Sequence, residues 1–267
     1  MGRKISIAIT IVGLVGVIAL YVNSVMNDGF TIDLTLKAGL VFISLIISLI
    51  KLLSGGFSSG SAIAKASESM AENAFSTDKK SRKKLIGAII LYNENKPNKA
   101  FKELSALRPM CRTSDDYRLV WSFAALCLMD TYAYSDAEVL LNELVYRGIT
   151  TPNIYNNLGY VHMKMGKSQE AVDAFESALM LDPDFYSAHM NLANLYFADY
   201  ELSAAKESAL KAHECDPTQK AAPSLLAVLC AMDGESEESE KYFHIAVSRG
   251  ESPDELRESI AYYTEKD

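Results

Sequence analysis

The sequence predicts an all-α protein in which a membrane-spanning helical hairpin precedes a solenoid of stacked helix pairs. Two apolar runs, residues 5–22 and 34–53, are each close to the roughly 20 residues that a helix needs to cross a bilayer. From residue 118 onward, apolar residues follow helical spacing twice within a repeating period of 34 residues. The first pattern indicates the hairpin, and the second indicates the solenoid.

The charge of the 267-residue chain is divided between its halves. Residues 1–117 carry a net charge of +6, whereas residues 118–267 carry −14. An acidic body argues against a nucleic-acid partner, because binding to phosphates requires a cationic surface. The four cysteines form no CxxC spacing, so we expect reduced thiols in a cytosolic body.

Residues 1–53 are predicted to form the transmembrane hairpin, with the lipid bilayer as the partner of residues 5–53. The connecting residues 23–33 hold two Asp and no Lys or Arg, while cations precede the first run and follow the second. The positive-inside rule then predicts a multi-pass protein of the plasma or inner membrane with both termini cytoplasmic. A cleaved signal peptide is the alternative, although the first run is long for one. Small residues such as Gly13, Gly16 and Ala19 suggest helix packing, possible between copies as a homo-oligomer.

Residues 54–80 are predicted to be a hinge and a basic collar. Residues 54–61 are rich in Gly and Ser, which favours a flexible tether. Residues 79–84 hold five cations, which either contact anionic lipid or form a solvated helix start. The sequence leaves both readings of the cations open.

The repeat is the strongest signal in the chain. Asp182-Pro183 recurs 34 residues later as Asp216-Pro217, and small residues recur at the same step. Pro removes a helical donor, so each Asp-Pro pair should end one unit and begin the next. We expect the recurring Gly and Ala to allow close helix crossing, with Gly159 and Ala193 on first helices facing Ala171 and Ala205 on second helices.

One unit closely resembles the tetratricopeptide repeat, through Tyr155, Leu158, Gly159, Ala171, Phe175, Ala178 and Pro183. The resemblance implies four units, at residues 118–151, 152–185, 186–219 and 220–252, with a degenerate helix pair at 81–117. Ser252, Pro253 and Glu255 predict the capped start of a final helix over residues 253–267, which would cover the exposed end of the stack.

The resemblance implies that the first helix of each pair lines a concave peptide-binding groove. The family pattern places the following residues in it: Ser122, Leu126, Met129, Asn153, Asn156, Asn157, Tyr160, Lys164, Ser187, Asn191, Asn194 and Phe197. Asn157 and Asn191 are one repeat apart and resemble a two-rung version of the asparagine ladder of O-linked N-acetylglucosamine transferase. An Asn amide offers both a donor and an acceptor to a peptide backbone. The alternative is that these Asn are solvated residues or helix-pair spacers.

The sequence offers no catalytic residue, cofactor site or metal site. Gly166-Lys167-Ser168 resembles the end of a phosphate-binding loop, but Val161 stands where that loop requires Gly. The histidines lack a paired ligand at helical spacing. An enzyme hidden in residues 62–117 is a rival reading, weakened because that stretch lacks His and is short for its own fold.

The sequence therefore predicts a non-enzymatic, membrane-anchored adaptor that binds a partner protein or an extended peptide at the cytoplasmic face. A structural subunit of a larger membrane complex is the alternative.

Overall fold

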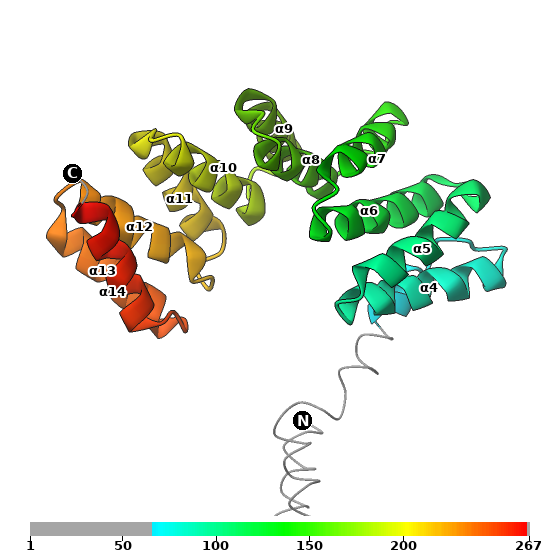
Figure 1. Ribbon diagram of the computed structural model, residues 1–267, viewed down its shortest axis with the longest axis horizontal. Coiled ribbons are helices and arrows are strands. Elements are labelled where there is room, and N and C mark those ends of the chain that lie inside the picture. The colour runs from blue at the N-terminus through cyan, green and yellow to red at the C-terminus, as the bar shows by residue number, and fades with distance from the viewer. Residues whose placement is uncertain (1–65, 266–267) are drawn as a thin grey trace, which may run out of the picture. The chain divides into compact units, whose positions relative to one another are not determined.

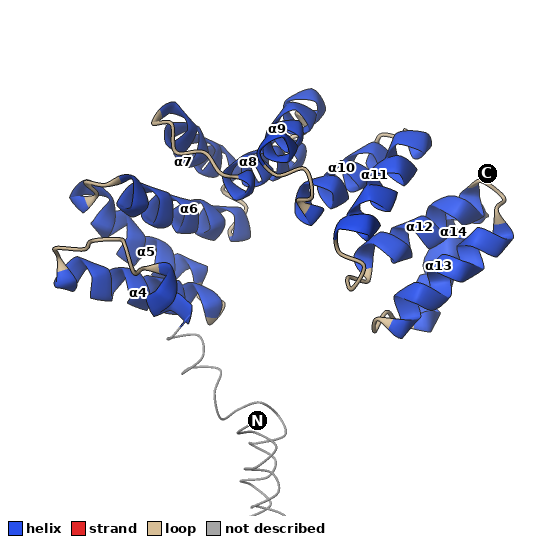
Figure 2. Ribbon diagram, turned by 180° about the vertical axis from the view of Figure 1, so that it is seen from behind, coloured by secondary structure: helices blue, strands red, loops and turns tan. Residues whose placement is uncertain are grey.

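The computed structural model describes residues 66–265. The chain divides into two compact units, residues 1–70 and 71–267, and the account below concerns the second. Within the described residues every regular element is a helix, and the helices are joined by short loops (Figures 1 and 2). This confirms the predicted all-α class.

The helices have similar lengths and follow one another closely along the chain. They are α4 (Lys79–Asn93), α5 (Pro97–Leu107), the 3₁₀ helix η1 (Arg108–Met110), α6 (Ser114–Asp130), α7 (Tyr134–Tyr146), α8 (Pro152–Lys164), α9 (Ser168–Leu181), α10 (Tyr186–Ala198), α11 (Leu202–Cys215), α12 (Ala221–Met232), α13 (Ser236–Ser248) and α14 (Pro253–Thr264).

Consecutive helices pack as pairs, and consecutive pairs pack against each other. The pairs are α4 with α5, α6 with α7, α8 with α9, α10 with α11, and α12 with α13. The first helix of each pair also packs on the second helix of the pair before it, as α8 does on α7 and α10 on α9. This nearest-neighbour stacking is that of a tetratricopeptide-like solenoid.

The small residues that recur at a step of 34 are buried in the pair interfaces. Ala137, Ala171 and Ala205 are fully inaccessible to solvent. Gly159 lies against the ring of Phe175 on α9, where a Cβ would come within 2.6 Å of the ring carbon Cε1. The need for glycine at position 159 thus comes from an aromatic ring, in addition to the close helix crossing that the sequence predicts.

The turns inside the pairs share one backbone feature. Tyr132, Gly166, Tyr200 and Gly234 each have a φ between 61° and 75°, in the left-handed region, and each is 34 residues from the next. Glycine adopts this conformation freely, whereas a bulky side chain does so only under strain. The two tyrosines are therefore strained members of a periodic set.

The Asp-Pro pairs lie between the helix pairs, as predicted. α9 ends at Leu181 and α11 ends at Cys215, so Asp182 and Asp216 are the residues that cap those helices. The Asp216 carboxylate accepts hydrogen bonds from the backbone N–H of Thr218 (3.0 Å) and from its hydroxyl (2.6 Å). These bonds hold the turn that leads into the next pair.

A buried carboxylate ties the start of the described solenoid to α6. The carboxylate of Asp116 accepts hydrogen bonds from the backbone N–H groups of Phe75 (2.6 Å), Arg112 (2.9 Å) and Thr113 (3.0 Å). Burial alone would raise the pKa of Asp116, but these bonds outweigh it and lower the pKa below the ordinary value of 3.8. Asp116 is therefore ionised in the folded chain at neutral pH.

The basic collar forms the first turns of α4. The side chain of Asp78 accepts hydrogen bonds from the backbone N–H groups of Lys80 and Ser81, which caps the helix. Because cations at a helix N-terminus oppose the helix dipole, this acidic cap offsets part of their cost. Of the two alternatives for the cations of residues 79–84, these contacts favour a solvated helix start over a lipid contact.

The predicted localisation is corrected. Among the helices of residues 66–265, none is long and apolar enough to span a bilayer. The longest of the helices named above, α6, has 17 residues and carries charges at both ends. The runs 5–22 and 34–53, the hinge at 54–61 and the small-residue faces suggested for a homo-oligomer lie outside the described residues, and the localisation based on them is not retained.

Candidate functional site

The predicted groove residues lie on the first helices α6, α8 and α10, and all of them are accessible. Asn153, Lys164 and Asn194 are exposed, and the other nine are half-buried. On α8, Asn153, Asn157, Tyr160 and Lys164 follow the spacing of one helix face. The set therefore forms partly exposed stripes on successive first helices, as a binding surface requires.

Two asparagines of this surface are hydrogen-bonded across neighbouring repeats. The Nδ2 of Asn191 on α10 donates to the Oδ1 of Asn156 on α8 at 2.9 Å. Each amide has further capacity, because Asn156 keeps its two N–H donors and Asn191 keeps its carbonyl oxygen. The bond fixes both amides in one orientation, with a donor group and an acceptor group left for a ligand.

Asn157 has a different environment from Asn191. Its side chain is half-buried on α8, and among the described residues its amide has no hydrogen-bond partner. The sequence period makes Asn157 and Asn191 equivalent, but the structure brings Asn156, 35 residues away, to Asn191. In the sequence, the bonded residue Asn156 directly precedes Asn157, the residue that recurs as Asn191.

Two aromatic residues and a lysine lie together beside these asparagines. The Nζ of Lys164 lies 5.3 Å from the centre of the Tyr160 ring, within the range of a cation–π contact. Burial, and then the neighbouring Tyr160, raise the pKa of Tyr134 at the start of α7. The Tyr134 phenol is therefore neutral at physiological pH and can donate a hydrogen bond.

The first helices from α8 onward carry almost no charge. In α8, α10 and α12, Lys164 is the single Lys, Arg, Asp or Glu, whereas the second helices α9, α11 and α13 each carry three or more. The acidic charge of this half of the chain thus lies largely on the second helices and the loops. A ligand bound to α8, α10 and α12 would therefore contact mainly amide, hydroxyl and apolar groups.

The last predicted groove residue, Phe197, is in contact with the C-terminal helix. Its ring lies 5.0 Å from the ring of Tyr263 on α14, in an edge-to-face arrangement. Phe197 therefore differs from the asparagines, because a helix of the same chain already lies against it.

The N-cap and the first helical residue of α14 agree with the sequence prediction, but the predicted capping box at Glu255 does not form. The Ser252 hydroxyl accepts a hydrogen bond from the backbone N–H of Glu255 (3.4 Å), and Pro253 is the first helical residue. The N–H of Ser252 donates to the side chain of Glu251 at 3.3 Å.

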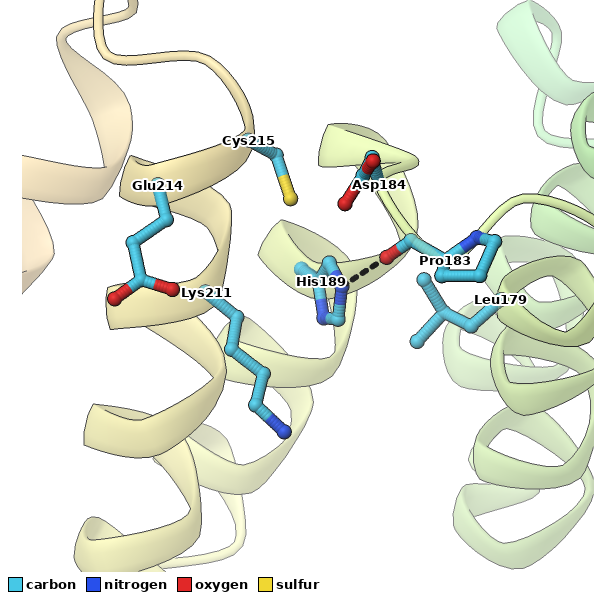
Figure 3. A pocket seen from close by; sticks show the side chains of 7 residues that line it. All are labelled: Leu179, Pro183, Asp184, His189, Lys211, Glu214 and Cys215. Carbon is cyan, nitrogen blue, oxygen red and sulfur yellow. Dashed lines mark hydrogen bonds between the residues drawn. The ribbon is translucent and has the colours of Figure 1, made fainter.

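A separate cavity of about 560 Å³ lies at the junction of α9, α10 and α11 (Figure 3). It is lined by Leu179, Pro183, Asp184, His189, Lys211, Glu214 and Cys215. The Nε2–H of His189 donates to the carbonyl oxygen of Pro183 at 2.9 Å, because a carbonyl can only accept. His189 is two residues from Ser187 and Asn191, or about 200° around α10, so this cavity lies away from the asparagine face.

The chemistry of this cavity does not activate a nucleophile. Burial, followed by the nearby Asp184 carboxylate, raises the pKa of the Cys215 thiol. The thiol therefore stays protonated at neutral pH. Within residues 66–265, no three or more His, Cys, Asp or Glu side chains are grouped as metal ligands.

Comparison with known proteins identifies the repeat. Residues 152–185, which comprise α8 and α9, match the tetratricopeptide repeat family. The pair α8–α9 is a tetratricopeptide repeat. It contains Asn156, Asn157 and Tyr160 of the predicted groove.

Two curated relatives match a short part of the chain. Tetratricopeptide repeat protein 6 of Homo sapiens is 34% identical over 68 residues, which are 26% of this chain and 13% of that protein. The uncharacterized protein ycf37 of Pyropia yezoensis is 32% identical over 73 residues, which are 27% of this chain and 38% of that protein. The chain thus spans well under half the length of either relative.

Solved structures show the same fold at low sequence identity. A thermophilic tetratricopeptide protein of Thermus thermophilus is 17% identical and has a TM-score of 0.55, with 68% of this chain and 98% of that chain covered. YrrB, described as a tetratricopeptide protein with an unusual peptide-binding site, is 18% identical with a TM-score of 0.51, and 78% and 100% of the chains are covered. These similarities show a tetratricopeptide-like fold.

Proposed function

We propose that the chain is an adaptor that binds an extended, uncharged segment of a partner protein along α6, α8 and α10. The hydrogen-bonded pair Asn156–Asn191 is the observation that carries this proposal. The two amides are held in place on an accessible face, so a ligand need not pay for ordering them. The description of YrrB as a peptide-binding protein supports the proposal, since the same fold hosts a peptide site there.

The charge distribution defines the class of segment. The net charge of −14 over residues 118–267 suggests a basic partner. However, α8 and α10 contribute only Lys164 to the charge, so their part of the face would not attract cations. The segment is therefore recognised through its backbone and through apolar or aromatic side chains, with Tyr160 and Leu126 as contacts.

The test is selection of extended peptides from a random library with the full chain, followed by affinity measurement of the selected peptides. Asn156→Ala/Asn191→Ala removes both amides, and Asn157→Ala removes the neighbouring one. Each hydrogen bond contributes about 1 kcal/mol, so the double variant should bind about 10-fold to 30-fold more weakly. Asn142→Ala on the exposed side of α7 is the matched control and should bind like the wild type.

Salt dependence provides the second measurement. Affinity should change less than about twofold between roughly 50 and 500 mM salt, because few charged groups face the ligand. Wild-type affinity of the double variant, with an unchanged circular dichroism spectrum, would refute the amide site. A selected set of basic peptides whose binding falls steeply with salt would refute the uncharged face.

A further inference from the structure

The helix α14 departs from the stacking rule that the other helices follow. Apart from its own pair partner, each first helix packs most on the second helix of the preceding pair, as α12 does on α11. By that rule α14 would lie on α13, but it packs mainly on α12 and only slightly on α13. The chain therefore turns back after α13 and places its last helix on the first helix of the last pair.

The surface under α14 is the continuation of the asparagine face. The apolar part of a cleft of about 340 Å³ is formed by Phe197 of α10, by Leu225 and Val228 of α12, and by Leu256 and Tyr263 of α14, while serine and glutamate side chains line the rest. At a step of 34 residues, Leu225 and Val228 are the equivalents of Asn191 and Asn194. The same helix face that carries amides on α8 and α10 thus carries apolar side chains on α12, and α14 covers them.

The contacts that hold α14 are few. Leu256 is its one buried residue, while Ile260 and Tyr263 are half-buried. The cleft shows that α14 does not fill the space between itself and α10. Elements with few buried apolar contacts open locally before the rest of a fold does.

One ion pair outside the cleft also holds α14. Arg257 donates from Nη1 and Nη2 to the two carboxylate oxygens of Glu240 on α13, at 2.6 and 3.0 Å. The Arg257 guanidinium also lies 3.9 Å from the centre of the Phe243 ring. The pair is largely exposed to solvent, where such contacts contribute little.

We propose that α14 is an internal occupant of the C-terminal part of the peptide groove, and that a partner's amphipathic helix takes its place on α12 and α10. The chemistry of α14 defines the partner, which must present apolar side chains at the spacing of Leu256, Ile260 and Tyr263. The proposal extends the groove of the proposed function, and its test uses no ligand of the asparagine face.

The probe is a fluorescein-labelled peptide of residues 252–267, added to the full chain and followed by fluorescence anisotropy. In the wild type, the tethered helix has an effective concentration of about millimolar and excludes the probe. The variant Arg257→Glu/Tyr263→Ala replaces the ion pair with a repulsion and removes the ring that contacts Phe197. This variant should bind the probe saturably and at least about 10-fold more tightly than the wild type does.

Two further variants locate the binding surface. Leu225→Arg, added to the releasing variant, places a charge in the apolar seat on α12 and should abolish probe binding. Glu258→Ala, on the exposed side of α14, is the matched control and should exclude the probe as the wild type does. Hydrogen exchange should show that the α14 amides exchange faster than those of α12 in the wild type, and faster still in the releasing variant.

Three results would overturn the proposal. They are a folded releasing variant that binds no probe, an unchanged affinity after Leu225→Arg, and α14 amides that stay as protected as those of α12 in the releasing variant. None of these results depends on Asn156 or Asn191. Failure here and failure of the asparagine site are therefore separate outcomes.

Discussion

The contact between Gly159 and Phe175 predicts the effect of a single added methyl group. In Gly159→Ala the new Cβ would lie 2.6, 2.7 and 3.0 Å from the ring carbons Cε1, Cδ1 and Cζ. Carbon atoms prefer about 3.5–4.0 Å, so the ring would have to move by about 1 Å. Phe175 is fully buried and has little room to do so.

The expected free-energy change follows from two opposing effects. Overpacking of this kind costs about 1–3 kcal/mol, and three ring atoms place this case near the upper end. Alanine favours helix over glycine by about 1 kcal/mol. Gly159→Ala should therefore lower the free energy of unfolding by about 2 kcal/mol, or the melting temperature by about 4–8 °C for a domain of this size.

The assay is thermal unfolding followed by circular dichroism, with Gly87→Ala on α4 as the control. No heavy atom lies within 4 Å of a Cβ at position 87, so this variant should be more stable than the wild type by about 1 kcal/mol. Adding Phe175→Leu to Gly159→Ala should recover part of the loss, because the shorter side chain makes room. A Gly159→Ala variant as stable as Gly87→Ala would refute the reasoning.

Three more predictions concern single sites. Tyr200→Gly should stabilise the chain by about 0.5–1 kcal/mol in denaturant unfolding, because Tyr200 is exposed and has a φ of 61°; a loss of stability would contradict the strain. Asp116→Asn should cost about 2 kcal/mol at pH 7, since a charged acceptor of buried N–H groups is lost. Its lowered pKa means that the carboxylate stabilises the fold above the ordinary value of 3.8 and that this contribution is lost as the pH falls through the lower pKa of the folded state, so the wild type and the variant should converge in acid. In a thiol-reactivity assay, half-buried Cys215 should react first and the other three only on unfolding, since burial raises the pKa of Cys111 to about 11 and of Cys127 to about 12; early modification of Cys127 would contradict this.

The helix pairs could be predicted from the sequence because their signals are local. A period of 34, Asp-Pro pairs at the junctions and small residues at fixed positions each follow from chain geometry within one unit. The structure places Ala171 and Ala205 in buried interfaces and ends α9 and α11 at the Asp-Pro pairs. Such features need no knowledge of how distant segments meet.

The details of the candidate site depend on contacts between units, and the repeat period of the sequence does not predict these contacts. Register makes Asn157 equivalent to Asn191, but the stacking of α8 on α10 decides that Asn156 makes the bond. The apolar face of α14 indicates that the helix is covered on one side, yet it does not say whether α12 or α13 covers it. The cavity at His189 likewise arises from three helices at a junction.

The membrane prediction rested on the length of two apolar runs, residues 5–22 and 34–53, and on the distribution of Lys and Arg around them. The helices described in residues 66–265 are short, and their apolar residues are shared between the two sides of a stack. The length of the two apolar runs gave no information on how the helices of residues 66–265 pack.

The left-handed turn at Tyr132, Gly166, Tyr200 and Gly234 has a consequence for how such a chain can change in length. Because each turn has the same backbone geometry at the same interval, the two helices of a unit are joined in the same way wherever the unit stands. A tandem duplication of residues 152–185 would therefore meet suitable neighbours on both sides. Growth or loss of whole units, in evolution or by design, can thus lengthen or shorten the protein while the two ends keep their own contacts.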